Sequence, residues 1–592
     1  MKRAKGNVAK PTKRKRKRGI RVASKRTQVE NGSMTDNATS VDLNKEAQET
    51  QNYDWYNLLV WLRRAAPGSD VTQKEFGEAQ AANPEYGERE HPDLSHWSSG
   101  VFSLQPISPV NKETLLQKPA GDQLEWLLVY QGEGARFEGP SRHGLMLALR
   151  DAVKESFNWS WDLANALVKH TGSDQELWSA IVDAWGSSSL TAENWGRVLT
   201  LVKETPGIEE AADRAVAVLL EHALDDDSAA PDTVFPSVIE IAERLIKHKK
   251  LKDGLVQQPP IDWLLLAINH AAGKAMLAWL RVLGRLREKV DDKWTGLAPV
   301  EQQRIDRVLD RKGTSSDRAR TIIASQVHFL FGLDPDWCLT KVLPLFDWTI
   351  DKTRAAQAWS GYLQWGRWNN ALFAAMRPYL EQTYKRIGSE LPDLVDALAT
   401  RLAGVALYGS EDPWHGWLEK FIADADPPTR VAWVRQVGHE LRQLKPEAIV
   451  LAWRRWIFDS WKDRLTGVPR PLTKEEREAI SEWVPRLDGV MSEAVALIEQ
   501  MDVPLAEHTS IFYELVERGL ASREPVASAR FTRHLLKGAK QLLWECEHLD
   551  KLVRTFIASR VERNLLLDLC DSMGRLGCPT ASALRELVPA AG

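Results

Sequence analysis

The chain has few of the features that would cross-link, anchor or export a protein. Its 592 residues include four cysteines, Cys338, Cys546, Cys570 and Cys578. Four scattered cysteines are too few for a disulfide scaffold, so reduced thiols inside a core are expected. No apolar run approaches the roughly 18–20 residues that a membrane span needs, and the N-terminus lacks the apolar stretch of a signal peptide. These absences predict a cytoplasmic protein without membrane contact.

Motifs that bind nucleotides or catalytic metals are also missing. The sequence has no G-x-x-x-x-G-K-[ST] phosphate loop, no H-E-x-x-H pair, and no G-x-G-x-x-G between a strand and a helix. The cysteines form no C-x-x-C pair, which disfavours a zinc site around Cys546 and Cys578. No cofactor is therefore expected, and an enzyme is the less favoured interpretation.

Acidic residues are absent before Glu30, and basic residues are concentrated there instead. Residues 1–26 hold 13 Lys or Arg, including the run Lys13, Arg14, Lys15, Arg16, Lys17 and Arg18. The remaining chain has 65 basic and 81 acidic side chains, a formal charge of -16 that the net value of -3 conceals. A segment that repels itself and buries little does not fold alone. Residues 1–52 are therefore predicted to form a disordered basic and polar tail.

Three interpretations of this tail remain open. Its cations could bind nucleic acid or direct nuclear import, or the tail could be a solvated extension without a role. It could also be upstream or expression-derived sequence that precedes a natural start at Met34, after Asn31-Gly32-Ser33. The acidic charge of the remaining chain gives no reason to extend nucleic-acid binding beyond the tail.

Proline and glycine distinguish two portions after the tail. Residues 53–121 contain six prolines and several glycines, which predicts a loop-rich N-terminal portion with a candidate strand at 101–107. Residues 122–592 consist of segments of about 12–20 residues with helical periodicity, separated by short Gly, Pro, Asp or Ser stretches. Asp174, Thr191, Asp334 and Thr473 stand at predicted helix starts, where their oxygens can accept hydrogen bonds from unpaired backbone amides.

Short connections make successive helices antiparallel neighbours, and such hairpins bury their apolar faces by stacking on one another. About twenty helices are predicted, without a fixed repeat period of the tetratricopeptide or ankyrin kind. The predicted fold is therefore all-α: an irregular HEAT-like α-solenoid at 122–592, preceded by the loop-rich portion and the disordered tail.

Tryptophan is the most abundant aromatic residue, with 25 Trp beside 14 Phe and 9 Tyr. Helical spacing places Trp453, Trp456 and Trp461 on one side of a predicted helix, and it spaces Trp359, Tyr362, Trp365 and Trp368 three residues apart. Rings in such stripes usually fill the contacts between helices. A groove in which nucleic-acid bases stack on them is the alternative.

The stretch AINHAAGK at 267–274 is the strongest candidate for a functional site. Small residues recur through it at helical steps, which predicts close helix packing, and Asn269, His270 and Gly273 interrupt the predicted helix near one end. His270 is expected to cap a carbonyl or an adjoining helix. The alternative is a binding or catalytic role with Asn269 and Lys274, although no acid partner or nucleophile stands at a diagnostic spacing.

A second polar cluster, His91, Asp93 and His96, stands in the loop-rich portion. Imidazole and carboxylate groups are ligands that zinc accepts, so a metal site or a hydrolytic centre is the alternative interpretation here. A histidine pair in a loop beside proline is the commoner case.

AINHAAGK, with Trp263 before it and Trp279 after it, resembles the NHPAGK signature of an uncharacterised all-helical region. That region follows sirtuin-like NAD-hydrolysing domains in some bacterial anti-phage defence proteins. Further stretches that resemble it lie at 90–97, 130–146, 358–367 and 453–476. The resemblance therefore spans most of residues 90–490.

Asn269, His270, Gly273 and Lys274 match the signature, whereas Ala271 stands where that family has proline. No sirtuin-like domain precedes the helical region in this chain. The resemblance implies a defence-associated sensor or scaffold that recognises a protein partner, either a phage component or an effector subunit. Any NADase activity would come from a sirtuin-like partner domain or chain. An NAD-consuming or hydrolytic enzyme with a site near His270 is the competing hypothesis.

Overall fold

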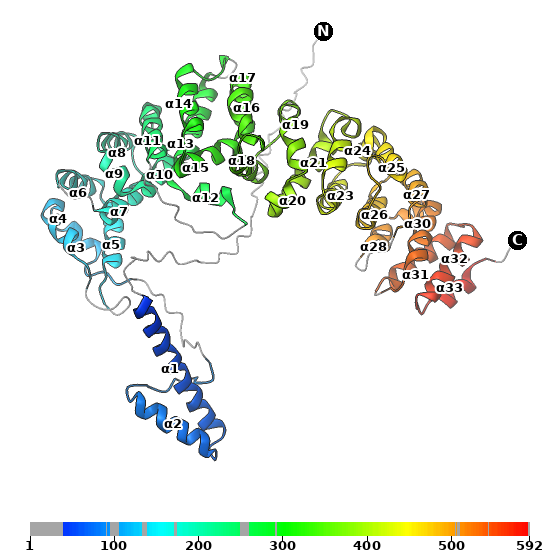
Figure 1. The fold of residues 1–592 in the computed structure, drawn as a ribbon, viewed down its shortest axis with the longest axis horizontal. Coiled ribbons are helices and arrows are strands. Elements are labelled where there is room, and N and C mark those ends of the chain that lie inside the picture. Colours follow the sequence, from blue (N-terminus) through cyan, green and yellow to red (C-terminus); the bar gives the residue numbers. More distant parts are fainter. Residues whose placement is uncertain are drawn as a thin grey trace, which may run out of the picture. The chain divides into compact units, whose positions relative to one another are not determined.

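A computed structural model describes residues 40–89, 91–94, 106–132, 139–170, 174–248, 260–290, 293–503, 505, 509–542 and 544–589, with side chains described from residue 51. The chain divides into two compact units, Met1–Leu104 and Gln105–Gly592. No strand occurs among the described residues, whose one β feature is an isolated bridge between Gly132 and Ser141. The prediction of an all-α helical-repeat fold is confirmed (Figure 1).

In the first unit, the described residues form a helical hairpin of α1 (Ser40–Ala65) and α2 (Asp70–Ala82). The two helices pack around a small core of Tyr56, Leu59, Val60 and Phe76. The predicted tail boundary at residue 52 falls inside α1, because the polar residues before it continue the helix. The basic run Lys13–Arg18 lies outside the described residues, and so does most of the candidate strand at 101–107.

The second unit is a succession of helices that follow one another in chain order (Figure 1). Its first part comprises α3 (Lys112–Leu116), α4 (Ala120–Val129), α5 (Arg142–Glu155), α6 (Phe157–Lys169), α7 (Gln175–Gly186), α8 (Ala192–Glu204), α9 (Pro206–Ala211), α10 (Asp213–His222), η1 (Asp232–Val234) and α11 (Phe235–Lys247). The predicted boundary at residue 121 falls inside α4, so the helical array begins earlier than the sequence suggested.

The middle part comprises α12 (Trp263–Asn269), α13 (Ala271–Val290), α14 (Pro299–Asp310), α15 (Thr314–Ser325), α16 (Val327–Leu333), α17 (Pro335–Trp337), η3 (Cys338–Val342), η4 (Leu343–Phe346), α18 (Lys352–Trp365), α19 (Asn370–Tyr384), α20 (Ile387–Glu390), η5 (Pro392–Leu394) and α21 (Val395–Tyr408). The last part comprises η6 (Trp414–Leu418), α22 (Glu419–Asp424), α23 (Pro427–Leu441), α24 (Pro446–Ala452), η7 (Trp453–Ile457), α25 (Phe458–Leu465), α26 (Lys474–Ser481), η8 (Val484–Arg486), α27 (Met491–Ile498), α28 (Ile511–Glu517), α29 (Leu520–Arg523), α30 (Pro525–Gly538), α31 (Cys546–Ala558), α32 (Arg563–Arg575) and α33 (Ala581–Leu587).

The described helices outnumber the predicted twenty because several periodic segments are interrupted by short breaks. One predicted helix is divided at His270 into α12 and α13, and others contain a single π-helical turn, as at Trp453–Ile457. The helix starts at Asp174, Thr191, Asp334 and Thr473 are as predicted: each side chain accepts a hydrogen bond from a backbone amide in the first turn.

Arginine side chains join successive parts of the second unit. At several places an arginine donates hydrogen bonds to carbonyl oxygens at or just beyond the end of an earlier helix, among them Arg142, Arg244, Arg285, Arg320, Arg401, Arg455 and Arg575. Arg401 on α21, for example, donates to Leu363 O near the end of α18 at 3.0 Å. A helix end leaves carbonyls without intrahelical partners and carries partial negative charge, so a guanidinium there is doubly stabilising.

Tryptophan side chains fill many of the contacts between helices of the second unit. The largest fully buried side chains include Trp185, Trp279, Trp359, Trp453 and Trp483. Their indole N–H groups find acceptors on other elements, as Trp483 does at Val434 O (2.9 Å) and Trp359 at Phe346 O (3.1 Å). Inter-helix packing is thus the role of both predicted stripes, although Trp365 at the end of α18 is 44% exposed.

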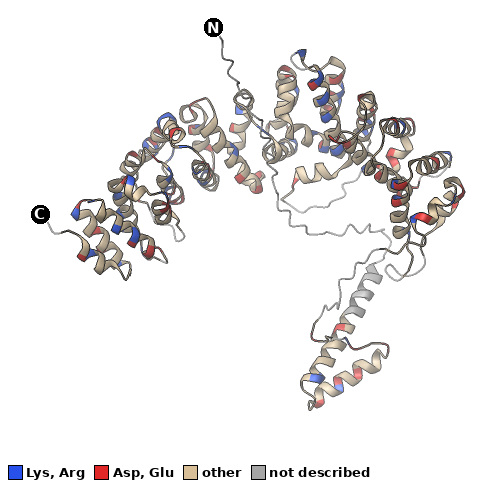
Figure 2. Cartoon of the chain, turned by 180° about the vertical axis from the view of Figure 1, so that it is seen from behind, with Lys and Arg blue, Asp and Glu red and all other residues tan. Residues whose placement is uncertain are grey.

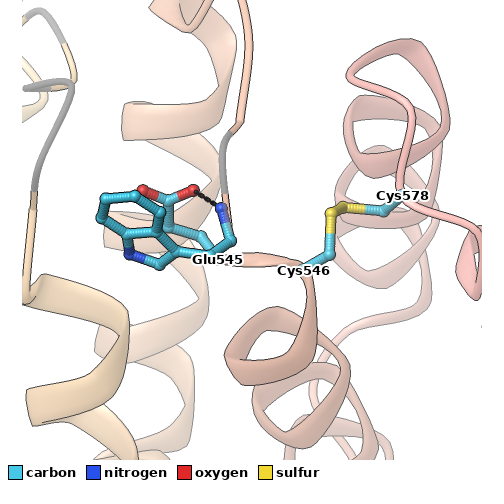
Figure 3. The surroundings of a disulfide bond; sticks show 4 residues. Glu545, Cys546 and Cys578 are labelled. Carbon is cyan, nitrogen blue, oxygen red and sulfur yellow. Dashed lines mark hydrogen bonds between the residues drawn. A yellow bond between two sulfur atoms is a disulfide. The ribbon is translucent and has the colours of Figure 1, made fainter. Parts of the chain in front are cut away.

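The expectation that all four cysteines are reduced is wrong. Cys546 at the start of α31 forms a disulfide with Cys578 in the turn between α32 and α33 (Figure 3). The pair is 32 residues apart in sequence, but the return of the chain through α32 brings the two Cα atoms to 5.4 Å. Cys338 and Cys570 are free and buried, as expected.

Candidate functional site

The candidate stretch AINHAAGK forms the junction between α12 and α13, which meet at an angle of 79°. Helix α12 ends at Asn269, His270 adopts an extended backbone conformation, and α13 begins at Ala271. None of the described helices is by itself long and apolar enough to cross a membrane, whereas α12 and α13 meet that test of length and composition only as this bent pair. The polar residues of the motif therefore occupy a sharp bend between two helices.

His270 holds this bend from both sides. Its backbone N–H donates to Ala267 O in α12 at 3.2 Å, and its ring Nδ1 accepts from the N–H of Ala272 in α13 at 3.1 Å. The side chain is only 3% exposed. An imidazole in this position satisfies one of the amides that every helix start leaves unpaired. His270 was expected to cap a carbonyl or an adjoining helix, and in the structure its ring accepts from a backbone amide at the start of α13.

Gly273 is required by the close approach of the two helices. A Cβ atom at this position would lie 1.9 Å from the carbonyl oxygen of Ala267, a separation that no pair of unbonded heavy atoms tolerates. Ala271, where the resembled signature has proline, is the first residue of α13, a position that proline favours because no intrahelical amide bond is lost there. The bend forms with alanine in its place.

Lys274 and Asn269 make structural contacts as well. The Lys274 ammonium lies 2.9 Å from Glu221 Oε2 on α10, with both side chains less than 20% exposed. Asn269 donates from Nδ2 to Leu265 O within its own helix at 2.9 Å. The fold brings all four candidate residues together, and it arranges them around a helix junction.

The second polar cluster belongs to the other compact unit. His91 and Asp93 are described there, whereas His96 lies outside the described residues. Over the part of the chain that the structure describes, no group of three His, Cys, Asp or Glu side chains is arranged to hold a metal ion.

The bend has a consequence for the surface, because it lays α12 against α15 and α18. Asp262 caps the start of α12, where its Oδ1 accepts from Leu265 N at 2.9 Å and from Gln364 Nε2 of α18 at 3.1 Å. The next residue, Trp263, packs under the guanidinium of Arg318 from α15, whose Cζ is 5.6 Å from the ring centroid. The start of α12 is thus fixed to two neighbouring helices.

Beside these residues lies a cavity of about 700 Å³. One wall is residues 260–263, a second is one side of α18 from Lys352 to Gln364, and the third is the turn from α20 into η5. Its apolar lining includes Ile261, Trp263, Ala356, Leu391 and Leu394. A cavity of this size with a largely apolar lining and a few polar groups is typical of a binding site.

Charge is distributed unequally over the lining of this cavity. Asp262, Glu390 and Asp393 contribute carboxylates, while Lys352 is the one basic group among the described lining residues. Glu390 and Asp393 are exposed and form no ion pair with any described residue. Sequence analysis missed this site because its three walls are far apart along the chain and each wall alone looks like an ordinary loop or helix end.

The stretch at 453–476, also part of the resemblance, encloses a buried charge network. Glu476 is fully buried and accepts from Arg464 Nη1 at 2.8 Å and from Arg430 Nε at 3.1 Å. Burial alone would raise the pKa of Glu476, but the hydrogen bonds and charge of Arg464, with smaller contributions from Thr473 and Arg430, hold the pKa below its usual value. These residues hold α23, α25 and α26 together and line no cavity described above.

Charges of both signs alternate along the described helices of the second unit (Figure 2). A surface that binds nucleic acid through its backbone would carry clustered lysine and arginine. Many of the arginines here are already engaged with helix ends or carboxylates, as Arg244 is with Lys203 O and Glu209.

Comparison of the chain with known protein families, with curated proteins and with solved structures finds no match in any of the three. The similarity to the helical region of defence proteins therefore stays a prediction that rests on the quoted motifs. The candidate site itself is the helix bend at His270 together with the cavity that the bend shapes.

Proposed function

We propose that this chain is a non-catalytic helical scaffold or sensor that recognises a protein partner. The proposal rests on the contacts that the residues of AINHAAGK make. Their polar groups form hydrogen bonds with the backbone and an ion pair with Glu221, and these contacts position one wall of a surface cavity. A reaction centre would instead need a nucleophile, a base and a stabilising group that converge on one point.

The proposed setting is bacterial anti-phage defence in the cytoplasm, with a phage component or an effector subunit as the partner. Two features support this setting: the order of the quoted motifs and the helical-repeat fold. Stacked helical hairpins suit sensing because small shifts at each joint add up along the array while every local contact is kept.

Affinity capture followed by reconstitution tests the proposal. The tagged chain is used to capture proteins from bacteria before and after phage infection, and each captured protein is purified and titrated against the chain. The proposal expects a stoichiometric complex with one phage or host protein. Turnover of NAD or of nucleic acid by the purified chain, lost in His270→Ala, would refute it in favour of the enzyme hypothesis.

Nucleic-acid binding through the tail is the second candidate, and the run Lys13–Arg18 is the observation that favours it. Neutralised phosphates release counterions, so affinity for duplex DNA should fall steeply as salt rises. Deletion of residues 1–33 should abolish that binding. Unchanged binding after the deletion would rule the tail out.

A further inference from the structure

We infer that the cavity beside α12 is the docking site for a short protein segment in which a lysine or arginine stands next to an apolar side chain. This inference rests on the proposed function and names the chemistry of its partner. Three properties of the cavity carry it: its lining, its charge and the way in which its walls are held.

The lining provides a place for an apolar side chain. Trp263, Leu391 and Leu394 contribute to it from two different walls, and Ala356 of α18 leaves space between them. A volume of about 700 Å³ exceeds what one side chain fills and suits two or three neighbouring residues of a peptide. Tryptophan anchored in this way is among the residues that contribute most to binding at protein interfaces.

The charge of the cavity selects a cation. Glu390 and Asp393 stand on the same wall, are exposed to solvent, and form no ion pair with a described residue. Asp262 adds a third carboxylate that already caps α12. Lys352 is the one basic side chain among the described lining residues. A lysine or arginine of the partner would find complementary charge here, whereas an acidic peptide or a phosphate would be repelled.

The walls are fixed before a partner binds. Gln364 bridges α18 to α12 by donating to Asp262 Oδ1 and to Ser360 Oγ, both at 3.1 Å. The other end of α12 is held by His270 and by the contact that Gly273 permits with Ala267. A preformed site loses little conformational entropy on binding, so a short segment can bind it with useful affinity.

A selection of random dodecapeptides displayed on phage tests the inference, with the full chain as the target. Peptides enriched on the wild type should share a lysine or arginine beside an apolar residue. Each is then synthesised and titrated against Glu390→Lys/Asp393→Lys and against a matched control, Glu419→Lys/Glu447→Lys, which changes two exposed acids elsewhere on the second unit. The cavity variant should lose about tenfold or more in affinity and the control should not.

Trp263→Ala provides the apolar half of the test, and it should weaken the same peptides without changing their preference for a cation. Three outcomes would overturn the inference. The enriched peptides are acidic or uncharged, they bind the cavity variant as well as the wild type, or no peptide is enriched on the wild type over that variant.

The two proposals can be told apart when one fails. A captured partner whose affinity is unchanged by Glu390→Lys/Asp393→Lys would refute this inference and leave the proposed function standing, whereas turnover abolished by His270→Ala would refute the proposed function itself.

Discussion

The two compact units of this chain use tryptophan in opposite ways. In the hairpin of α1 and α2, Trp55 and Trp61 are 49% and 41% exposed, and the buried core consists of four side chains. In the second unit most tryptophans are buried between helices, where Trp453, for example, has no exposed surface. Both the hairpin and the second unit are helical and have buried apolar side chains, so helix formation alone does not account for the difference.

The difference lies in the number of neighbours. A helix inside the array has a helix before it and another after it, so its apolar stripe is covered, and an indole N–H such as that of Trp453 can find an acceptor on a neighbouring element. Two helices alone can cover only one face of each, and the rings on the outer face stay partly exposed. Tryptophan therefore fills a contact between helices only where a further helix is stacked on it. Tryptophan substitutions should cost more unfolding free energy in the second unit than in the hairpin.

Trp453→Ala should give the largest effect. The substitution removes a buried ring and the 3.0 Å hydrogen bond from Nε1 to Glu493 Oε2, so a loss of about 3–5 kcal/mol of unfolding free energy is expected. Urea unfolding followed by circular dichroism measures it. A loss below about 1 kcal/mol would mean that this ring does not form a packed joint.

Removal of the disulfide should rank next. Cys546→Ser/Cys578→Ser opens a loop whose ends are 32 residues apart, and a cost of about 2–4 kcal/mol in unfolding free energy is expected from the loop-closure entropy of the unfolded chain. A dithiol reductant should destabilise the wild type and leave the double variant unaffected. Mass spectrometry of the chain alkylated in urea without reductant should find two labelled cysteines, Cys338 and Cys570; four would contradict the disulfide.

Glu476→Gln should cost about 2–3 kcal/mol and change the response to acid, because it removes the charge between Arg430 and Arg464. The folded-state pKa of Glu476 lies below the ordinary value of 4.5. Its contribution is therefore fully present above that value and is lost as the pH falls through the folded pKa. Stability profiles of wild type and variant should converge below pH 4.5; parallel profiles would show that Glu476 does not titrate in this way.

Gly273→Ala should cost about 2 kcal/mol, because the new Cβ forces Ala267 and α12 away from α13. Gly284→Ala is a matched control in the same helix, since a Cβ there meets only the Phe329 ring at 3.7 Å. The control should be neutral or stabilising by up to about 1 kcal/mol, as is usual for alanine inside a helix. Equal effects in urea unfolding would show that the bend does not need glycine.

Trp61→Ala should give the smallest effect, within about 0.5 kcal/mol, because Trp61 lies outside the small core of the hairpin and is already 41% exposed. Its contrast with Trp453→Ala measures the difference between the two units directly. A loss of several kcal/mol would show that another helix covers α1. Thermal unfolding with a probe on the hairpin suits this comparison, since the two units need not unfold together.

The sequence was enough to predict an all-helical array, because helical periodicity and local capping residues such as Thr473 act over a few residues. It was not enough to count the helices: the interruption near His270 was predicted, but the sharp bend that makes two helices depends on how closely Ala267 and Gly273 approach in space. The hydrogen bonds from arginines to earlier helix ends could not be predicted either, because they join residues far apart in sequence. Arg401 and its acceptor Leu363, for example, are 38 residues apart.

The sequence indicated AINHAAGK as a candidate site, but the contacts of its residues could not be read from its letters. Asn269, His270 and Lys274 are residue types that serve equally in catalysis and in helix capping, and only the bond from Ala272 N to His270 Nδ1 distinguishes the two. The cavity could not be predicted at all, because Trp263 and Asp393 meet through the fold alone.

Nicotinamide release from NAD is the measurement that tests the central claim most directly. The purified chain and His270→Ala are incubated with NAD, and free nicotinamide is followed by chromatography, with circular dichroism to show that both remain folded. Because His270 is accounted for as the cap of a helix bend, neither protein should release nicotinamide above the buffer blank. Release by the wild type that disappears in a folded His270→Ala would contradict this account.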